Sequence, residues 1–390
     1  MTRLPPCSAV RHPLARATFW SSTAALAWTQ VGYGAFLAVL RRLRGAGSNP
    51  PEPDALPAVA LVVAAYAEED VIAAKVADAL ALDWPRDKLQ VVVAVDGGAE
   101  PGADATAERA RAAGADLVLE LPRGGKVRAQ DAAVAASRGE LLAFTDANAS
   151  WEPGALRALA GAFADPAVGY ACGQVTFVNE QGTNQEGVYW RYEMWLRAHE
   201  SALASITAGN GAIYAVRRRA YLHVDAVMGH DLSFPFNIVK RGLRAVYVPD
   251  ARATEKMVPT IEGEGARKRR MMSHAWAIVL RGGLLDPRGQ SPLYALMLVS
   301  HRLLRYASPL LHLAAAGATL ALLREGPVYR AAALAQLGLL AAAAAGGHVR
   351  LRPLLLARYY VATTAALGAG LHDHLRHGTP AVWEAAEGTR

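Results

Sequence analysis

Hydrophobic and polar positions divide the chain into three regions with different patterns. Residues 18–40 carry no charge and run directly into the basic sequence "RRLR" at 41–44. An uncharged stretch of about 20 residues is long enough to cross the hydrocarbon core of a bilayer. A cleaved signal peptide would have a shorter apolar core and small residues at its cleavage site, where arginines stand here. We therefore expect residues 1–44 to contain a membrane-spanning helix at about 18–40, followed by a Pro/Gly-rich linker at 45–57.

The middle region, residues 58–265, alternates short apolar runs with helical patterns. Runs rich in Val, Leu and Ala predict buried strands, and the segments between them predict helices. This alternation is typical of right-handed βαβ units that build a largely parallel sheet, so we expect an α/β domain. Ligands of such sheets bind at the carboxyl ends of the strands. The predicted strands are 58–65, 90–95, 116–120 and 140–145, and the predicted helices are 68–82, 103–113, 126–137 and 152–164.

The last region is apolar again. Residues 266–300 mix basic, aromatic and aliphatic side chains and predict an amphipathic segment that lies along a membrane interface. Ala- and Leu-rich segments within residues 301–373 then predict three membrane-spanning helices. A buried helical bundle is the alternative, but its helices would carry a polar stripe that these segments largely lack. The three segments are 306–323, 331–347 and 353–371, and residues 374–390 form a tail.

Composition and charge support a membrane protein. The 390 residues are 53% hydrophobic, and 41 basic against 34 acidic residues give a formal net charge of +7. The basic clusters flank apolar blocks, which favours a partner at the edge of a lipid bilayer over nucleic acid. Cys7 and Cys172 are far apart and predict neither a disulfide framework nor a metal site.

Acidic residues follow the first two predicted strands. The turn after the first strand contains no G-x-G-x-x-G sequence, so this is not a Rossmann dinucleotide site. Glu68, Glu69 and Asp70 are expected in the first turn of the next helix, where negative charge suits the helix dipole. Asp96 ends the second strand before two glycines. Its carboxylate fits an Asx-type turn or a hydrogen bond to a nucleobase or ribose about equally well.

Lys126 follows a Gly-Gly turn at the expected start of an Ala-rich helix. A cation is mildly unfavourable at a helix N-terminus, because the dipole there prefers anions. A lysine makes sense at this position if it meets a phosphate that the same helix end attracts. A solvated lysine is the simpler alternative.

Asp146 and Asn148 follow the strand "LLAFT" and are separated by one residue. Ser150 can cap the next helix, which leaves Asp146 without a structural explanation. Both side chains can direct oxygen ligands at one hard cation. Mg²⁺ or Mn²⁺ typically uses one or two carboxylates and completes its shell with water and substrate phosphates. We therefore expect Asp146 to hold a cation that holds a diphosphate.

Asp231 precedes an apolar helix and fits either a helix N-cap or a general base at the rim of a site. The neighbouring His230 could tune Asp231 or lie on the surface, and we expect the surface position. The aromatic segment at 187–201 could line a path for a sugar acceptor, although its near-helical spacing is more typical of core residues.

The order of these motifs resembles glycosyltransferase family 2. The motifs are "VVAAYAEED", "VVVAVDGG", "GGKVRAQDAA", "FTDAN", "GNGAIYAVRR" and "GHDLSFPFNIVKRG". The resemblance covers about residues 56–275 and is closest to the membrane-embedded branch that includes cellulose, hyaluronan and poly-N-acetylglucosamine synthases. It implies a GT-A fold, a nucleotide-sugar donor, a divalent cation and transfer with inversion at the anomeric carbon.

The resemblance also implies roles for individual residues. Asp96 contacts the nucleoside of the donor, with Glu68 on the neighbouring turn, and Lys126 lies near the diphosphate. Asp146 is the first acid of the D-x-D metal motif, with Asn148 in the place of the second. Asp231 is the catalytic base that takes a proton from the acceptor hydroxyl.

The chain departs from the family pattern in three places. Ala67 stands where "YNEE" has its asparagine, and Asn148 replaces the second acid of D-x-D. The Q-x-x-R-W signature of processive synthases has only a degenerate counterpart in "RKRRM", with Arg267 and Arg270 in the Gln and Arg places. This basic run fits a diphosphate contact or a membrane-surface patch equally well. Long-chain polymerisation is therefore not predicted.

These observations lead to one main hypothesis. The chain is expected to be a membrane-bound inverting glycosyltransferase that moves a sugar from a nucleotide-sugar, with UDP as the expected nucleotide, to a polysaccharide or lipid-linked acceptor. Its catalytic domain is expected on the cytoplasmic side of the cell membrane, where nucleotide-sugars are made. A nucleotide-sugar-binding scaffold without turnover is the alternative, supported by Ala67 and Asn148. A transporter is disfavoured because four spans are few for a pore.

Overall fold

The computed structural model describes residues 12–45, 56–178, 187–256 and 261–382. The chain forms two compact units. One comprises residues 1–35 and 299–369 and is helical, and the other comprises residues 36–298 and 370–390 and contains the sheet. Cys7 and most of the predicted linker lie outside the described residues.

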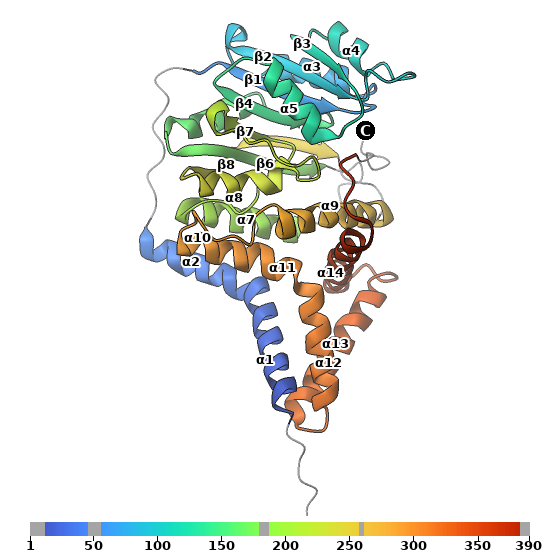
Figure 1. The fold of residues 1–390 in the computed structure, drawn as a ribbon. Helices are drawn as coiled ribbons and strands as arrows, with labels where there is room; N and C mark the ends of the chain where they lie inside the picture. The colour runs from blue at the N-terminus through green and yellow to red at the C-terminus, as the bar shows by residue number, and fades with distance from the viewer. Residues whose placement is uncertain (1–11, 46–55, 179–186, 257–260, 383–390) are drawn as a thin grey trace, which may run out of the picture. The chain divides into compact units, whose positions relative to one another are not determined.

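The sheet has eight strands in the order β3-β2-β1-β4-β7-β6-β8-β5. The first four of these run parallel to one another (Figure 1), as the sequence predicts. In register, Ala64 of β1 pairs with Asp146 of β4. The bounds are β1 (Val59–Ala65), β2 (Leu89–Asp96), β3 (Leu117–Leu121), β4 (Leu141–Asp146), β5 (Ala149–Trp151), β6 (Val168–Val178), β7 (Tyr214–Arg217) and β8 (Arg244–Lys256).

Beyond β4 the sheet is mixed. Strand β7 is antiparallel to both β4 and β6, β8 runs parallel to β6, and β5 is antiparallel to β8. Strand β8 is not among the strands predicted from the sequence, because "RAVYVPDARATEK" interrupts its apolar residues with proline and charges. The pairing of β5 with β8 overturns the expectation that Ser150 caps a helix. Ser150 lies within β5 and its hydroxyl donates to Asp78 Oδ1 at 2.9 Å.

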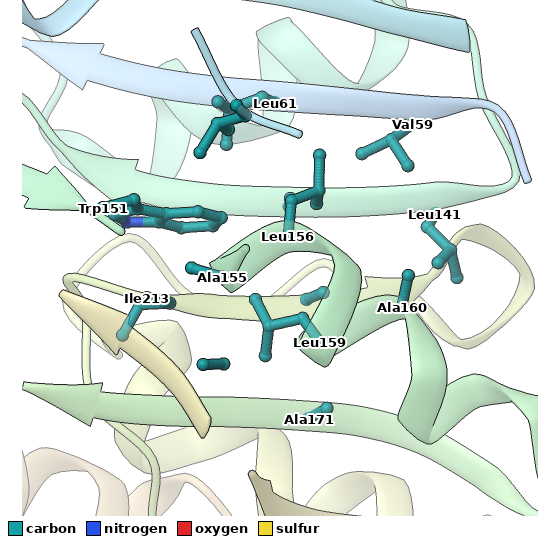
Figure 2. Packing of buried hydrophobic residues seen from close by; sticks show 14 of the residues in the cluster. Val59, Leu61, Leu141, Trp151, Ala155, Leu156, Leu159, Ala160, Ala171 and Ile213 are labelled. Carbon is teal, nitrogen blue, oxygen red and sulfur yellow. The ribbon is translucent and has the colours of Figure 1, made fainter. Parts of the chain in front are cut away.

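Helices cover both faces of the sheet because side chains of a strand alternate between faces and both sets are apolar. Val59 and Leu61 of β1 face a cluster that includes Leu156 of α6 (Figure 2), whereas Ala60 and Val62 face the opposite cluster. Helices α3, α4 and α6 pack on the first side, and α5, α7 and α8 pack on the second. The bounds are α3 (Ile72–Leu80), α4 (Thr106–Ala112), α5 (Lys126–Ala136), α6 (Ala155–Gly161), α7 (Gly187–Leu203) and α8 (His230–Lys240).

Helix α3 begins later than the sequence predicts. Its first residue is Ile72, so Glu68, Glu69 and Asp70 lie on the preceding turn and not in its first helical turn. The turn is held by α4 instead, since the backbone amide of Glu68 donates to Thr106 Oγ1 at 2.9 Å. Tertiary contacts with α4 therefore take the place of the expected dipole interaction.

Among the residues that the structure describes, three helices are long and apolar enough to cross a membrane, namely Pro13–Arg44, Pro327–Ala345 and Arg352–His377. The first is continuous through α1 (Pro13–Ala27), a π-helical turn (Trp28–Gly32) and α2 (Tyr33–Arg44). The last two are α13 and α14. The remaining predicted span corresponds to α12 (Ser308–Leu322), which has 15 residues and is shorter than a typical span.

Within the helical unit, α1 packs on α12 through an apolar cluster. Phe19 is buried against Leu322, and its ring meets Tyr329 edge-on at 5.0 Å between centroids. The segment predicted to be interfacial is largely helical, with α9 (Ile261–Arg281) and α10 (Pro292–Leu298) in the sheet-containing unit.

Candidate active site

The carboxyl end of β4 meets the N-terminus of α5. Helix α5 begins at Lys126, as predicted, directly after Gly125, whose φ of +94° favours glycine. The Lys126 ammonium forms an ion pair with the Asp146 carboxylate. Both side chains are about a quarter exposed, at 23% and 26%, so a ligand can reach the pair.

Asp96 anchors the turn that leads into α5. Its buried carboxylate accepts hydrogen bonds from the backbone amides of Gly124 at 2.6 Å and Gly125 at 3.0 Å, and pairs with the Arg123 guanidinium. The guanidinium of Arg123 also lies over the Tyr66 ring, with its carbon 3.2 Å from the centroid. Asp96 therefore preorganises the Gly-Gly turn and holds a flat cation against an aromatic face at this sheet edge.

Asp231 lies in the first turn of α8, where Gly229 and not Asp231 is the N-cap. A Cβ on Gly229 would lie 2.7 Å from Asp231 Oδ1, so glycine makes room for the carboxylate. The backbone carbonyl of Asp231 accepts from the Gly209 amide at 2.7 Å. Burial raises the pKa of Asp231, Lys126 opposes this, and Asp146 adds to it. The surface of the Asp231 side chain is half-buried.

Glu255 is a residue of this site that the sequence analysis missed. It lies on β8 opposite Ala149 of β5, and the Asn148 side chain hydrogen-bonds to it. Burial and the Asp146 charge raise the pKa of Glu255 to about 7, against the opposing effects of Arg267 and Lys126. No local pattern marks Glu255, because the strand pairing of β5 with β8 brings it to the site.

Lys126 is surrounded by three carboxylates. Burial alone lowers the pKa of this lysine, but the ion pair with Asp146 and the charges of Asp231 and Glu255 outweigh it and raise the pKa. A Cβ on Gly211 would lie 3.3 Å from the Lys126 ammonium and 3.4 Å from Asp146 Oδ2, so the "GNG" loop also borders the pair. The cluster is strongly acidic around one ammonium, which suits a divalent cation and an anionic ligand together.

Lys75 forms a hydrogen bond to the backbone that follows the loop between β4 and β5. This lysine is 3% exposed, and its ammonium donates to the Ala149 carbonyl at 2.8 Å and to Asp78 at 3.3 Å. Burial lowers the pKa of Lys75, and Asp78 and Asp146 partly offset this effect. Lys75 therefore fixes the backbone that follows Asn148.

The structure brings Asp96, Lys126, Asp146, Asn148 and Asp231 to one edge of the sheet, with Glu68 on the adjacent β1–α3 turn. Arg267 and Arg270 lie on α9 and are half-buried. The positive charge of Arg267 lowers the pKa of Glu255.

His230 is buried, contrary to the expectation of a surface position. It is 3% exposed, and its ring stacks on Phe234 with centroids 4.1 Å apart. The His230 side chain therefore packs in an apolar environment at the first turn of α8.

Within α7, Trp190 has a structural role. Its indole nitrogen donates to the Val175 carbonyl at 2.8 Å and its ring meets Phe177 edge-on. Trp195 is 39% exposed and stacks on Tyr192. Only the second pair presents an aromatic surface of the kind expected for an acceptor path.

The residues at the site fit a hard divalent cation. Asp146, Asn148 and Glu255 offer carboxylate and amide oxygens, which Mg²⁺ and Mn²⁺ prefer. The Lys126 ammonium marks the place on Asp146 that binds positive charge. Among the described residues, no group of three His, Cys, Asp or Glu side chains could hold a metal by itself. A cation here would therefore share its shell with ligand oxygens.

The mixed α/β sheet is that of the GT-A glycosyltransferases, whose solved structures are similar to it. The chain belongs to the family described as "Glycosyltransferase like family 2", which it matches over residues 57–273. The expected fold and the expected enzyme class are both confirmed.

Curated relatives carry the name N-acetylglucosaminyltransferase. A protein from Rhizobium sp. (strain N33) is 28% identical over 51% of this chain and 48% of its own length. A protein from Rhizobium meliloti is 28% identical over 52% of each chain. The chain thus spans about half the length of the curated relatives it matches.

A solved structure is similar over most of the chain. It is the mannosyltransferase PcManGT from Pyrobaculum calidifontis in complex with GDP-Man and Mn²⁺, at 26% identity and a TM-score of 0.71. The match covers 93% of this chain and 99% of the other. The similarity therefore extends beyond the sheet domain into the flanking helices.

Proposed function

We propose that this protein is a membrane-bound inverting glycosyltransferase that moves a sugar from a nucleoside-diphosphate sugar to an acceptor hydroxyl. The observation that carries the proposal is the Lys126 ammonium surrounded by Asp146, Asp231 and Glu255 at the sheet edge of a family 2 domain. The cluster combines a cation for a diphosphate with a carboxylate base in one place.

Each residue has a chemical task in this proposal. The N-terminus of α5 and Lys126 bind the diphosphate. Tyr66 and Arg123 offer an aromatic face and a flat cation to the nucleobase next to Asp96. Asp231 takes the proton from the acceptor hydroxyl while that oxygen attacks the anomeric carbon from the side opposite the diphosphate.

Asp146, Asn148 and Glu255 would hold the divalent cation. When bound, Mg²⁺ or Mn²⁺ neutralises charge that builds on the departing nucleoside diphosphate. Asn148 contributes no charge, and Glu255 supplies a second carboxylate close by.

The names of similar proteins contain two different sugars, N-acetylglucosamine and mannose. We therefore propose a nucleoside-diphosphate hexose as the donor, with UDP-sugars tested first. The acceptor is a polysaccharide or a lipid-linked glycan held at the bilayer. Three helices of sufficient length support a multi-pass protein of the cell membrane. The catalytic domain then faces the cytoplasm, where the donor is made.

Turnover by the purified full chain tests the proposal. Nucleoside diphosphate release is measured with a panel that includes UDP-N-acetylglucosamine and GDP-mannose, with Mg²⁺ or Mn²⁺. Asp231→Asn is expected to lower release by about 10²- to 10⁴-fold. Asp225→Asn is the control, because Asp225 is an exposed acid of the preceding loop that accepts from the Val227 amide. Binding of donor without any release would favour the scaffold alternative.

A further inference from the structure

A buried chain of hydrogen bonds links the two helices that carry Lys126 and Asp231. The Gln130 amide on α5 donates to the Tyr214 hydroxyl on β7 at 3.2 Å. The same hydroxyl lies 3.0 Å from His230 Nδ1 on α8. The three side chains are only 2%, 1% and 3% exposed, so water does not compete for these bonds.

The ends of this chain lie next to the reacting groups. Gln130 is one helical turn after Lys126, and His230 immediately precedes Asp231. These hydrogen bonds thus connect the helix end proposed to bind the diphosphate with the helix turn that carries the proposed base.

The direction of the bonds follows from the donors. The Gln130 amide donates to the Tyr214 oxygen. We assign the Tyr214 hydroxyl as the donor to His230 Nδ1, because this direction also gives the hydroxyl proton an acceptor. Burial lowers the pKa of His230 to about 3, which keeps the ring neutral. The ring proton then lies on Nε2, a buried atom with no hydrogen-bond partner among the described residues.

An apolar surround holds the two rings in place. Tyr214 stacks on Phe144 with centroids 4.7 Å apart, and His230 stacks on Phe234 at 4.1 Å. A buried N–H without a partner costs about 1–3 kcal/mol. A leucine would avoid that cost, so the imidazole is explained best by the bond that it accepts from Tyr214.

We propose that Tyr214 and His230 are positioning residues for the transfer reaction. Together with the Gly209 bond to the Asp231 carbonyl, their link sets where the first turn of α8 places the Asp231 carboxylate relative to Lys126. The inference rests on the proposed function, because it concerns the geometry between the donor and the base. Neither residue contacts the donor or the acceptor in this scheme.

Tyr214→Phe tests the link in the full-length protein. The variant keeps the ring on Phe144 and removes both hydrogen bonds. We expect kcat for nucleoside diphosphate release to fall about 10- to 100-fold, because small misplacement of a reacting group is costly. The KM for the donor should stay within about twofold, since Lys126 is untouched.

Tyr221→Phe is the matched control. Tyr221 belongs to the same aromatic cluster, 6.0 Å from Phe144, but its hydroxyl donates to Asp131 at 2.7 Å instead of to α8. We expect kcat to remain near that of the parent. An equal fall in both tyrosine variants would show a general packing effect and overturn the proposal.

Two changes at His230 give an independent test that does not depend on the folding of Tyr214→Phe. His230→Gln retains an acceptor for the hydroxyl and should keep most of the activity, whereas His230→Leu should lose kcat as Tyr214→Phe does. The double variant Tyr214→Phe/His230→Leu should have the same kcat as His230→Leu alone, because both substitutions remove the same hydrogen bond. Equal kcat in His230→Gln and His230→Leu would overturn the proposal.

The failure of this inference can be distinguished from that of the proposed function. Full release by Asp231→Asn contradicts the base assignment itself. An inactive Asp231→Asn together with fully active Tyr214→Phe and His230→Leu contradicts only the positioning role.

Discussion

The Lys126 ammonium and the Asp146 carboxylate form an ion pair between the start of α5 and the end of β4. The pair joins the two motifs "GGK" and "TD", which lie on neighbouring elements at one edge of the sheet. A diphosphate and a divalent cation would each take one partner of this pair. Charges complementary to the diphosphate and to the cation therefore lie side by side at the place where both would bind.

Removal of the Asp146 carboxylate should weaken cation binding. Asp146→Asn is expected to weaken Mn²⁺ binding by about 10-fold or more and to lower nucleoside diphosphate release in parallel, because a hard cation depends on carboxylate ligands. Electron paramagnetic resonance of Mn²⁺ measures the binding without turnover. Asn148→Asp is the companion change and should tighten binding. Equal Mn²⁺ affinity in all three proteins would contradict the assignment.

Glu255 should make stability depend on pH. Its pKa is raised from 4.5 to about 7, so the folded chain keeps a proton that the unfolded chain loses. This contribution is full below pH 4.5 and is lost as pH rises through about 7. The melting temperature of Glu255→Gln should therefore fall less between pH 5 and pH 8 than that of the parent protein.

His230 contributes with the opposite sign in part of that range. Its pKa is lowered from 6.5 to about 3, so its contribution is present above pH 6.5 and is lost as pH falls towards 3. The difference between the parent and Glu255→Gln cancels this term. Identical pH profiles for the two proteins would show that Glu255 ionises normally.

Ala67 has a strained backbone that asparagine should relieve. Its φ is +49°, the only positive value at a non-glycine residue among those the structure describes. Asparagine tolerates this left-handed region better than alanine. We expect Ala67→Asn to raise the free energy of unfolding by about 0.5–1 kcal/mol. The control Ala73→Asn, at an exposed position of α3, should lower it, because asparagine is the poorer helix former.

Gly125 should not tolerate a side chain. Its φ is +94°, and a Cβ there would lie 2.4 Å from the carbonyl oxygen of Ala381. Gly125→Ala is expected to destabilise the fold by about 1–2 kcal/mol and to raise the KM for the donor, because the turn moves away from Asp96. Gly154→Ala is the control, since no atom lies within 4 Å of a Cβ at that position. Unchanged melting temperature and KM in Gly125→Ala would refute this view of the turn.

Local patterns were sufficient for the parallel half of the sheet. Apolar runs predict β1, β2, β3 and β4 within a residue or two, and Asp96 and Asp146 occupy the strand ends as expected. Lys126 likewise begins its helix where predicted. These predictions succeed because each depends on residues that are neighbours along the chain. The same reasoning misplaced Ser150 and His230, whose surroundings come from distant segments.

The sequence by itself determined the alternation of strands and helices, the apolar helices and the residues that close the parallel strands, since hydrophobic period and strand ends are local properties. Only the tertiary structure decided which other groups join them. Glu255 reaches Asn148 through the β5–β8 pairing, and Tyr214 joins α5 to α8 through β7. Such contacts depend on which strands pair and in which register, and long-range pairing leaves no periodic signal in the segments that it brings together.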